Sequence, residues 1–362
     1  MRIMLQDAVD LARGAAFLGA AGGGDPYIGR LMLEQAIATH GPIEFLAIDD
    51  VADDGLVVPA AMFGAPSVMI EKLPNGAEAE HALRAVEKAV GKPACAILPA
   101  EIGGINALLP IVLAANTGLP VIDADGMGRA FPELQMVTFN VFGNPASPAA
   151  LADETGNCVL IEASDNLAAE RFARNTTVTM GAVAQICCYP MLGANAKRCV
   201  VRGTLTLALG IGRAIRQARE AHLNPVDALL AHLRTTDYYQ HCKVLFDGKV
   251  SDLRRETSRG FTIGSVTISD STERERLVVQ FQNENLAARR NGRTVAIVPD
   301  LITILDRETA EPVTTEALKY GQRVKVVGAS VPPVMRLPQS LAVFGPRSFG
   351  FDEDFQPIES LS

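Results

Sequence analysis

The feature that most constrains the fold is an alternation of short apolar runs with helical patterns in the first third of the chain. Short apolar runs are typical of strands buried on both faces. The expected strands are residues 43–48, 56–62, 94–98 and 119–122, and the expected helices are 4–18, 28–40, 77–90 and 103–117. This alternation favours a mostly parallel sheet with helices packed on it. The sequence therefore predicts an N-terminal α/β domain.

The pattern changes beyond about residue 165. Helices are expected at 167–187 and 204–222, and Asn224-Pro225 is a suitable cap and first turn for another helix. Strands are expected at 261–268, 276–281, 294–298 and 323–327, with a hairpin turn at Asp247-Gly248 and a docked tail at 344–350. We therefore divide the chain into a mostly parallel α/β domain, 1–165, and a mixed α+β, strand-rich domain, 166–362.

Charge differs between the same two parts. Residues 1–165 contain 8 basic and 21 acidic side chains, residues 166–362 contain 25 and 20, and the net charge is -8. A nucleic-acid-binding protein normally shows a basic footprint, which the chain as a whole lacks. We therefore expect no nucleic-acid partner.

Two uncharged stretches, 102–122 and 175–196, have the length of membrane spans. Both contain Pro, Gly and Asn, which suit buried α/β segments better than lipid-facing helices. Six cysteines without a C-x-x-C spacing indicate a reducing compartment rather than a disulfide framework. We expect a cytoplasmic protein with no membrane partner. The adjacent Cys187 and Cys188 are either a reactive pair or two core residues.

A glycine loop is the first candidate site. Gly22, Gly23 and Gly24 precede Asp25 and a predicted helix. Glycines let backbone N–H groups approach a ligand closely, and a helix N-terminus favours an anion. A helix rather than a strand precedes the loop, so neither nucleotide-binding glycine motif is supported. The loop is either an anion site or a tight connection between two helices.

The second candidate site consists of polar residues that follow two predicted strands. They are Glu101, Asn106, Asp123, Asp125, Arg129 and Glu133. In open parallel sheets, ligands bind just outside the carboxyl ends of strands. If the carboxylates of Glu101, Asp123 and Asp125 converge, they would raise one another's pKa or bind a cation. Arg129 would pair with them or bind a substrate carboxylate, and a purely structural ion-pair network is the alternative.

Two further polar groups carry weaker signals. Asn283 and Asn285 would either hydrogen-bond an imide-like ring or form a hairpin turn. Arg254, Arg255 and Arg259 would either bind a carboxylate or form a solvated face. The chain has five His without metal-ligand spacing and has no G-x-S-x-G sequence, which disfavours a zinc hydrolase and an α/β-hydrolase serine.

Several longer motifs together resemble the S-methyl thiohydantoin desulfurase family, once a domain of unknown function found beside hydantoinase and oxoprolinase genes. They are GGGDPY at 22–27, GLPVIDADGMGRAFPE at 118–133, FDGKV at 246–250, FQNEN at 281–285, PDLI at 299–302 and GPRSFG at 345–350. The resemblance covers nearly the whole chain as an N-terminal and a C-terminal domain. The stretch from Asp123 to Arg129 is its most specific part.

The resemblance implies net hydrolysis of an S-methyl thiohydantoin to a hydantoin, with release of methanethiol. This reaction needs a base for water and an acid for the departing sulfur or a ring nitrogen. We expect Asp125 to be the base and Glu101 or Asp123 the acid or its orienting partner. A divalent metal at these three carboxylates would instead activate the water, and no other cofactor is indicated. The expected substrate-binding residues are Gly22, Gly23, Gly24, Asp25, Asn106, Arg129, Glu133, Asn283 and Asn285.

Two other functions remain open. A non-catalytic partner subunit of a hydantoinase or oxoprolinase system would have a large apolar surface patch and no enclosed carboxylate pocket. A sensor of hydantoin-type compounds would bind the same ligands without turnover. The expected partners are therefore a small-molecule substrate, further copies of the chain in a homo-oligomer, or a hydantoinase- or oxoprolinase-type protein.

Overall fold

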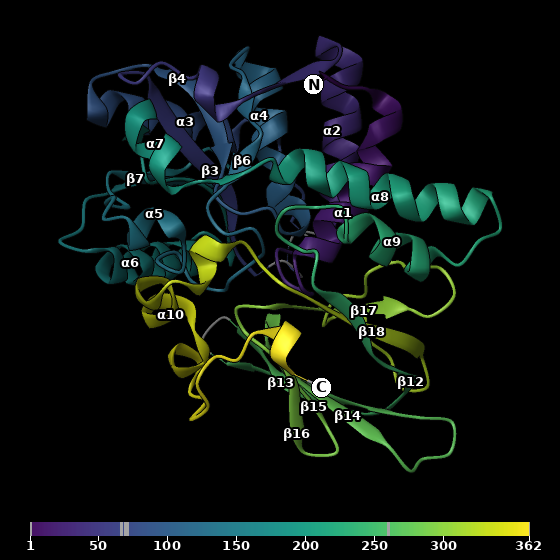
Figure 1. Cartoon of the computed structure of the whole chain (residues 1–362). Coiled ribbons are helices and arrows are strands. Elements are labelled where there is room, and N and C mark those ends of the chain that lie inside the picture. The colour runs from purple at the N-terminus through teal and green to yellow at the C-terminus, as the bar shows by residue number, and fades with distance from the viewer. Residues whose placement is uncertain (1, 66–67, 69–71, 259–260, 362) are drawn as a thin grey trace.

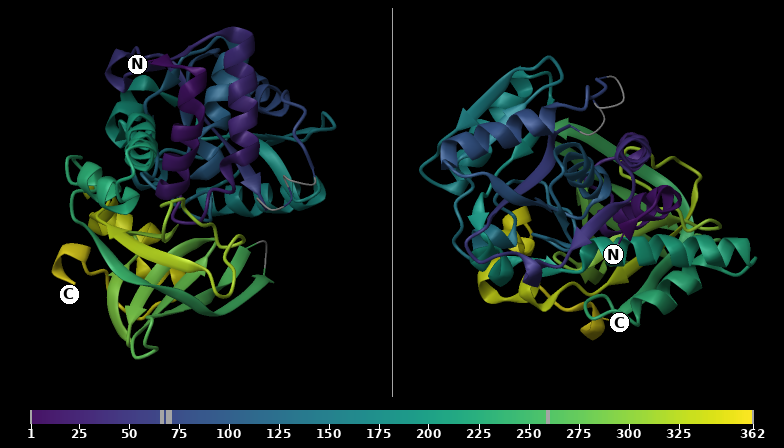
Figure 2. Two further views of the ribbon diagram at one scale, coloured as in Figure 1. Left: turned by 90° about the vertical axis from the view of Figure 1, so that its right-hand side faces the viewer. Right: turned by 90° about the horizontal axis from the view of Figure 1, so that it is seen from above.

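The computed structural model describes residues 2–65, 68, 72–258 and 261–361, so Arg259 lies outside the described residues. The chain forms two bodies, each built on one large sheet (Figure 1). Helices surround the first sheet, and the second sheet is almost free of them (Figure 2).

The first sheet has the strand order β1-β2-β5-β4-β3-β9-β7-β8. Its strands are β1 (Arg2–Ile3), β2 (Ile43–Leu46), β3 (Leu56–Gly64), β4 (Ala94–Pro99), β5 (Val121–Ile122), β7 (Ala149–Ala152), β8 (Cys158–Ile161) and β9 (Val183–Cys187). The four central strands β2, β5, β4 and β3 are parallel, which confirms the expected α/β class. The flanking strands β1, β9, β7 and β8 are antiparallel. Short β10 (Met191–Leu192) pairs with β3, and β6 (Ala124–Asp125) pairs with β11 (Val201–Arg202).

Three of the helices around this sheet begin at a side-chain cap. The helices are α1 (Ala8–Leu18), α2 (Pro26–His40), α3 (Glu78–Val90), α4 (Leu109–Thr117), α5 (Thr138–Val141), α6 (Asn166–Thr179), α7 (Gly193–Cys199), α8 (Thr204–Glu220) and α9 (Pro225–Leu233). The side chain of Asp165 accepts a hydrogen bond from the N–H of Ala168 at the start of α6, and Asn224 caps α9 in the same way. The continuous helix expected over 167–187 is wrong. Gly181 and Ala182 adopt positive φ angles, which end α6 and lead into β9.

The second sheet is antiparallel throughout and has the order β16-β15-β14-β13-β12-β18-β17. Its strands are β12 (Cys242–Ser258), β13 (Phe261–Ser269), β14 (Arg276–Gln282), β15 (Glu284–Arg290), β16 (Arg293–Ile297), β17 (Leu301–Asp306) and β18 (Arg323–Ala329). The expected strand-rich second domain is confirmed, but the hairpin turn at Asp247-Gly248 is wrong. These residues lie inside β12, which pairs first with β18 and then with β13. A side chain at Gly248 would overlap the carbonyl oxygen of Ser269, so the glycine allows β13 to approach where β12 changes partner.

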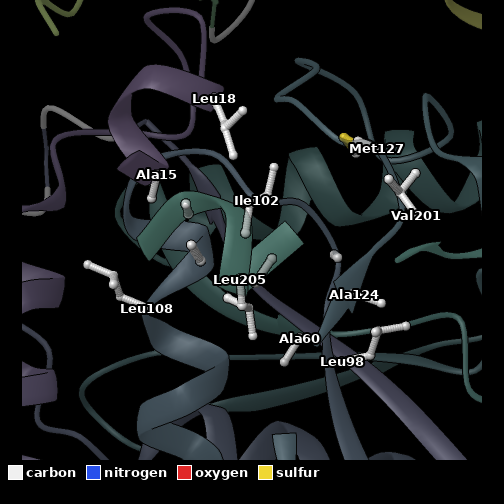
Figure 3. Packing of buried hydrophobic residues seen from close by; sticks show 14 of the residues in the cluster. Ala15, Leu18, Ala60, Leu98, Ile102, Leu108, Ala124, Met127, Val201 and Leu205 are labelled. Carbon is white, nitrogen blue, oxygen red and sulfur yellow. The ribbon is translucent and has the colours of Figure 1, made fainter. Parts of the chain in front are cut away.

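The elements from α6 to α9 belong to the first body. Strand β9 is hydrogen-bonded between β3 and β7, and α8 packs along α1. The boundary expected at 165/166 therefore lies among elements packed around the first sheet, and the second sheet begins at Cys242. Figure 3 shows part of the core of the first body, including Leu18 of α1, Ile102 after β4 and Leu205 of α8.

The C-terminal tail returns to the first body (Figure 1). Helix α10 (Pro338–Phe344) packs near α5, and the ring of Phe344 stacks on that of Phe131 with 4.9 Å between centroids. The tail therefore docks on the segment that follows β6.

Candidate functional site

A pocket lies between the two bodies. The first body contributes the ends of β3 and β9, the residues after β4, part of segment 127–137 and one side chain of α6. The second body contributes Asn283 and Glu284, at the turn between β14 and β15. The carboxyl ends of β3 and β4 meet here, which is the position that a parallel sheet favours for a ligand.

Glu101 follows β4 and lines this pocket. Its Oε1 accepts a hydrogen bond from the side-chain amide of Asn106, and its Oε2 accepts one from the N–H of Phe131 at 3.3 Å. Asn106 is itself held, because its Oδ1 accepts from the N–H of Met62 at 2.7 Å. Burial raises the pKa of Glu101 to about 8, although both hydrogen bonds oppose that shift. This carboxyl group therefore changes charge near neutral pH.

Glu284 lines the same pocket from the second body. Its side chain is buried, and Oε2 has no hydrogen-bond partner in the described part of the chain. Burial raises the pKa of Glu284 well above its ordinary value, the charge of Glu101 raises it further, and Arg129 opposes the shift. The two glutamates therefore form an interacting pair of carboxyl groups, one from each body.

The glycine loop connects the two bodies and contributes little of its own surface to the pocket. Gly23 lines the pocket, whereas Gly22, Gly24 and Asp25 do not belong to its lining. The carbonyl of Gly23 accepts a hydrogen bond from the N–H of Ile105 at 2.9 Å. Asp25 instead caps α2 by accepting from the N–H of Tyr27 at 2.8 Å. The loop is therefore a tight connection between α1 and α2. It also contacts the second sheet, because the carbonyl of Ala20 accepts a hydrogen bond from the N–H of Asn285 at 2.8 Å.

Of the three carboxylates expected to converge, only Glu101 lines the pocket, although the charge of Asp125 contributes to the raised pKa of Glu101. Asp125 is buried and accepts hydrogen bonds from the N–H groups of Met127 at 2.9 Å and Gly128 at 2.8 Å. Burial raises the pKa of Asp125 to about 7. Asp123 accepts from the N–H of Leu205 at 2.9 Å, at the start of α8. Each side chain thus binds a different element, and the described residues contain no group of three or more His, Cys, Asp or Glu that could hold a metal ion.

Arg129 joins the two bodies through hydrogen bonds to main-chain carbonyls of the second body. Its Nη1 donates to the carbonyls of Pro299 at 2.8 Å and Asp300 at 2.9 Å, and its Nη2 donates to that of Asn285 at 3.1 Å. Arg129 is fully buried and absent from the pocket lining. Its expected part in holding a substrate tail is therefore incompatible with its position.

The other expected substrate-binding residues divide between the pocket and the interior. Asn283 lines the pocket, but its Oδ1 accepts from the N–H of Thr262 at 2.8 Å. Asn285 is buried and donates to the carbonyl of Ile302 at 3.0 Å. Glu133 lines the pocket and accepts a hydrogen bond from the side chain of Gln135.

Sequence reasoning did not assign Arg174 and Glu284 to the site, and both line the pocket, as does Cys188 of the adjacent cysteine pair. Glu284 carried a usable signal, since it is a charged residue at the start of the apolar run Leu286-Ala287-Ala288. Cys188 is buried, and burial raises the pKa of its thiol to about 12, so the group is a neutral thiol near pH 7. Arg174 has no distinguishing sequence signal, because only the fold brings α6 to the pocket.

These features define a class of protein in which an antiparallel second body closes an acidic pocket at the ends of parallel strands. The chain belongs to the S-Me-THD-like family. The family's N-terminal domain matches residues 6–163, and its C-terminal domain matches residues 164–358. This match confirms the resemblance carried by the motifs.

A protein from Chromobacterium violaceum, known from an X-ray crystal structure, has the same fold. Its TM-score to this chain is 0.83 at 24% sequence identity, over 99% of this chain and 100% of that one. Comparison with curated proteins finds no match. Across the described residues, none of the helices combines the length and the apolar character that crossing a membrane requires.

Proposed function

We propose that this protein hydrolyses an S-methyl thiohydantoin to a hydantoin and methanethiol, with Glu101 and Glu284 as the proton-transferring pair. One observation carries the proposal. Two buried carboxyl groups, one from each body, line a single pocket, and their pKa values are both raised. A pair of this kind supplies a base and an acid at the same time, because repulsion between the two groups keeps one of them protonated.

The first step adds water across the C=N bond of the ring. The Glu101 carboxylate takes one proton from the water as its oxygen bonds to the carbon that carries the S-methyl group. Glu284, whose pKa is the more strongly raised, gives its proton to the ring nitrogen. The product is a tetrahedral adduct that carries both a hydroxyl and the S-methyl group.

The second step reverses the two roles. The Glu284 carboxylate takes the hydroxyl proton as the C=O bond forms and the C–S bond breaks. The protonated Glu101 gives its proton to the departing sulfur, so methanethiol leaves as the neutral thiol. Both glutamates return to their starting states, and one water has been consumed. Asn106 acts as a positioning residue by holding Glu101 Oε1.

The pocket also supports an enzyme over the partner-subunit alternative. A partner subunit requires no enclosed carboxyl groups, and keeping two of them out of water is costly. Buried ionisable groups with perturbed pKa values in a pocket are typical of catalytic sites. A sensor would use the same pocket without turnover, so only a turnover assay separates these two functions.

The decisive experiment is a thiol-release assay with S-methyl thiohydantoin propionate, run before and after chelation. We expect methanethiol release by the wild type that is insensitive to the chelator, and at least about a 100-fold lower kcat in Glu101→Gln and in Glu284→Gln. Glu162→Gln, an exposed substitution in the first body, serves as the control. If the folded protein releases no thiol but binds the substrate, the sensor function replaces this proposal.

A further inference from the structure

One cationic side chain in the pocket has no part in the proton transfers described above. Among the described residues that line the pocket, Arg174 of α6 is the only Lys, Arg or His. Arg129, the residue expected to bind an anion, is occupied by main-chain carbonyls. For an anionic group on a ligand, Arg174 is therefore the cationic side chain available among the described residues of the lining.

The Arg174 guanidinium is held firmly along one edge. Its Nε donates to Oε1 of Glu170 at 2.8 Å, and its Nη2 lies 2.6 Å from the same oxygen and donates to the carbonyl of Pro132 at 3.0 Å. Glu170 is fixed in turn, because its Oε2 accepts from the N–H of Leu134 at 2.9 Å. These contacts orient the guanidinium before a ligand arrives, which lowers the entropic cost of binding.

Two aromatic rings, one from each body, pack against the same guanidinium. Its Cζ lies 4.5 Å from the ring centroid of Phe63 in β3 and 4.7 Å from that of Phe261 in β13. Such contacts fix the plane of the group and shield it from water. The remaining nitrogen, Nη1, has no hydrogen-bond partner among the described residues. It is also absent from the buried atoms that lack a partner, so it is accessible. It therefore offers its N–H groups to a ligand.

The surroundings of Arg174 favour a carboxylate over a doubly charged anion. Glu170 already offsets part of the charge of the guanidinium, and Glu133 lines the same pocket. Two nearby carboxylates would repel a phosphate dianion, whereas a carboxylate matches one guanidinium in charge and geometry. Apolar walls that include Met62, Met127 and Phe131 suit an uncharged ring beside that carboxylate.

We propose that Arg174 binds a carboxylate on the substrate's side chain and so restricts the enzyme to cyclic substrates with an anionic tail. This inference rests on the proposed function, because it concerns the same pocket. Arg174 is a specificity-determining residue and takes no part in the proton transfers.

The test compares two ligands that differ only in charge: hydantoin propionate and its neutral propionamide. Isothermal titration should show that the wild type binds the acid at least about 10-fold more tightly than the amide. Arg174→Gln should weaken binding of the acid about 10- to 100-fold and leave the amide nearly unchanged. Arg174→Lys should recover part of the lost affinity for the acid, because lysine keeps the positive charge but lacks the planar, paired N–H donors of a guanidinium. Arg171→Gln, on the same helix and exposed, is the matched control.

Each outcome separates this inference from the proposed function. Thiol release from S-methyl thiohydantoin propionate and from its S-methyl thiohydantoin propionamide counterpart with the same KM would leave the hydrolysis standing and overturn the role of Arg174. Loss of the charge preference in Arg174→Gln, without thiol release by the wild type, would support the role of Arg174 and overturn the hydrolysis. Equal binding of both ligands by the wild type, or binding of neither, counts against Arg174 even if the variants do not fold.

Discussion

Gly22 leaves the space that the carboxyl group of Glu284 occupies. A Cβ at residue 22 would lie 2.5 Å from Cγ of Glu284 and closer still to its Oε1. Distances this short would force the side chain of Glu284 to move, and its burial leaves it little room to do so. The glycine loop thus acts on the pocket through the space that it leaves for a partner from the second sheet.

Gly22→Ala should therefore displace Glu284 and lower kcat at least about 10-fold, with a loss of about 1–3 kcal/mol in the free energy of unfolding. A double-mutant cycle with Glu284→Ala tests the cause, since the shortened side chain removes the clash. Denaturant titration should find that Gly22→Ala lowers the free energy of unfolding much less in the Glu284→Ala background than in the wild type. An equal loss of unfolding free energy in both backgrounds would show that the effect of Gly22→Ala does not come from a clash with Glu284.

The raised pKa of Glu101 predicts a dependence of stability on pH. The pKa is about 8 in the folded protein and 4.5 ordinarily, so between these values the folded state binds more protons than the unfolded state. Stability should therefore fall as pH rises through this window, by a few kcal/mol in order of magnitude. Glu101→Gln stays neutral and should lose this contribution. Its melting temperature relative to the wild type should rise between about pH 5 and about pH 9. A difference in melting temperature that stays constant across this pH range would contradict the raised pKa of Glu101.

The same group predicts the pH dependence of turnover. If the Glu101 carboxylate is the base, kcat/KM should rise with pH and level off above about 8. The measurement is thiol release at low substrate concentration across this range, with protein concentration corrected for the folded fraction. An unchanged rate from pH 5 to pH 9 would exclude Glu101 as the base.

Asp125 should behave as a structural residue. Its carboxylate accepts from the N–H groups of Met127 and Gly128, and it does not line the pocket. Asp125→Asn places an amide donor against one of these N–H groups and should cost about 1–3 kcal/mol of stability. The kcat of the folded variant should change less than about 10-fold, in contrast to Glu101→Gln. A loss in Asp125→Asn as large as that in Glu101→Gln would make Asp125 the base after all.

Local patterns in the sequence were enough to predict the class of fold. Buried strands such as β3 and β4 read as apolar runs because both faces of a parallel strand are covered, and the cap at Asn224-Pro225 is a property of two adjacent residues. The same reasoning failed at Asp247-Gly248, where glycine serves a contact with a distant strand, and at β9, which follows α6 after only a short turn.

The candidate site divides in the same way. The sequence determined that polar residues follow β4, and Glu101 and Asn106 do line the pocket there. Only the tertiary structure decided which second carboxyl group lines the pocket with Glu101. Asp123 and Asp125 are close to Glu101 in the chain, yet main-chain N–H groups hold them at other elements. Glu284 and Arg174 are distant in sequence and reach the pocket because the second sheet and α6 pack there. Backbone pattern is a local property, whereas the environment of a buried charge depends on every segment packed around it.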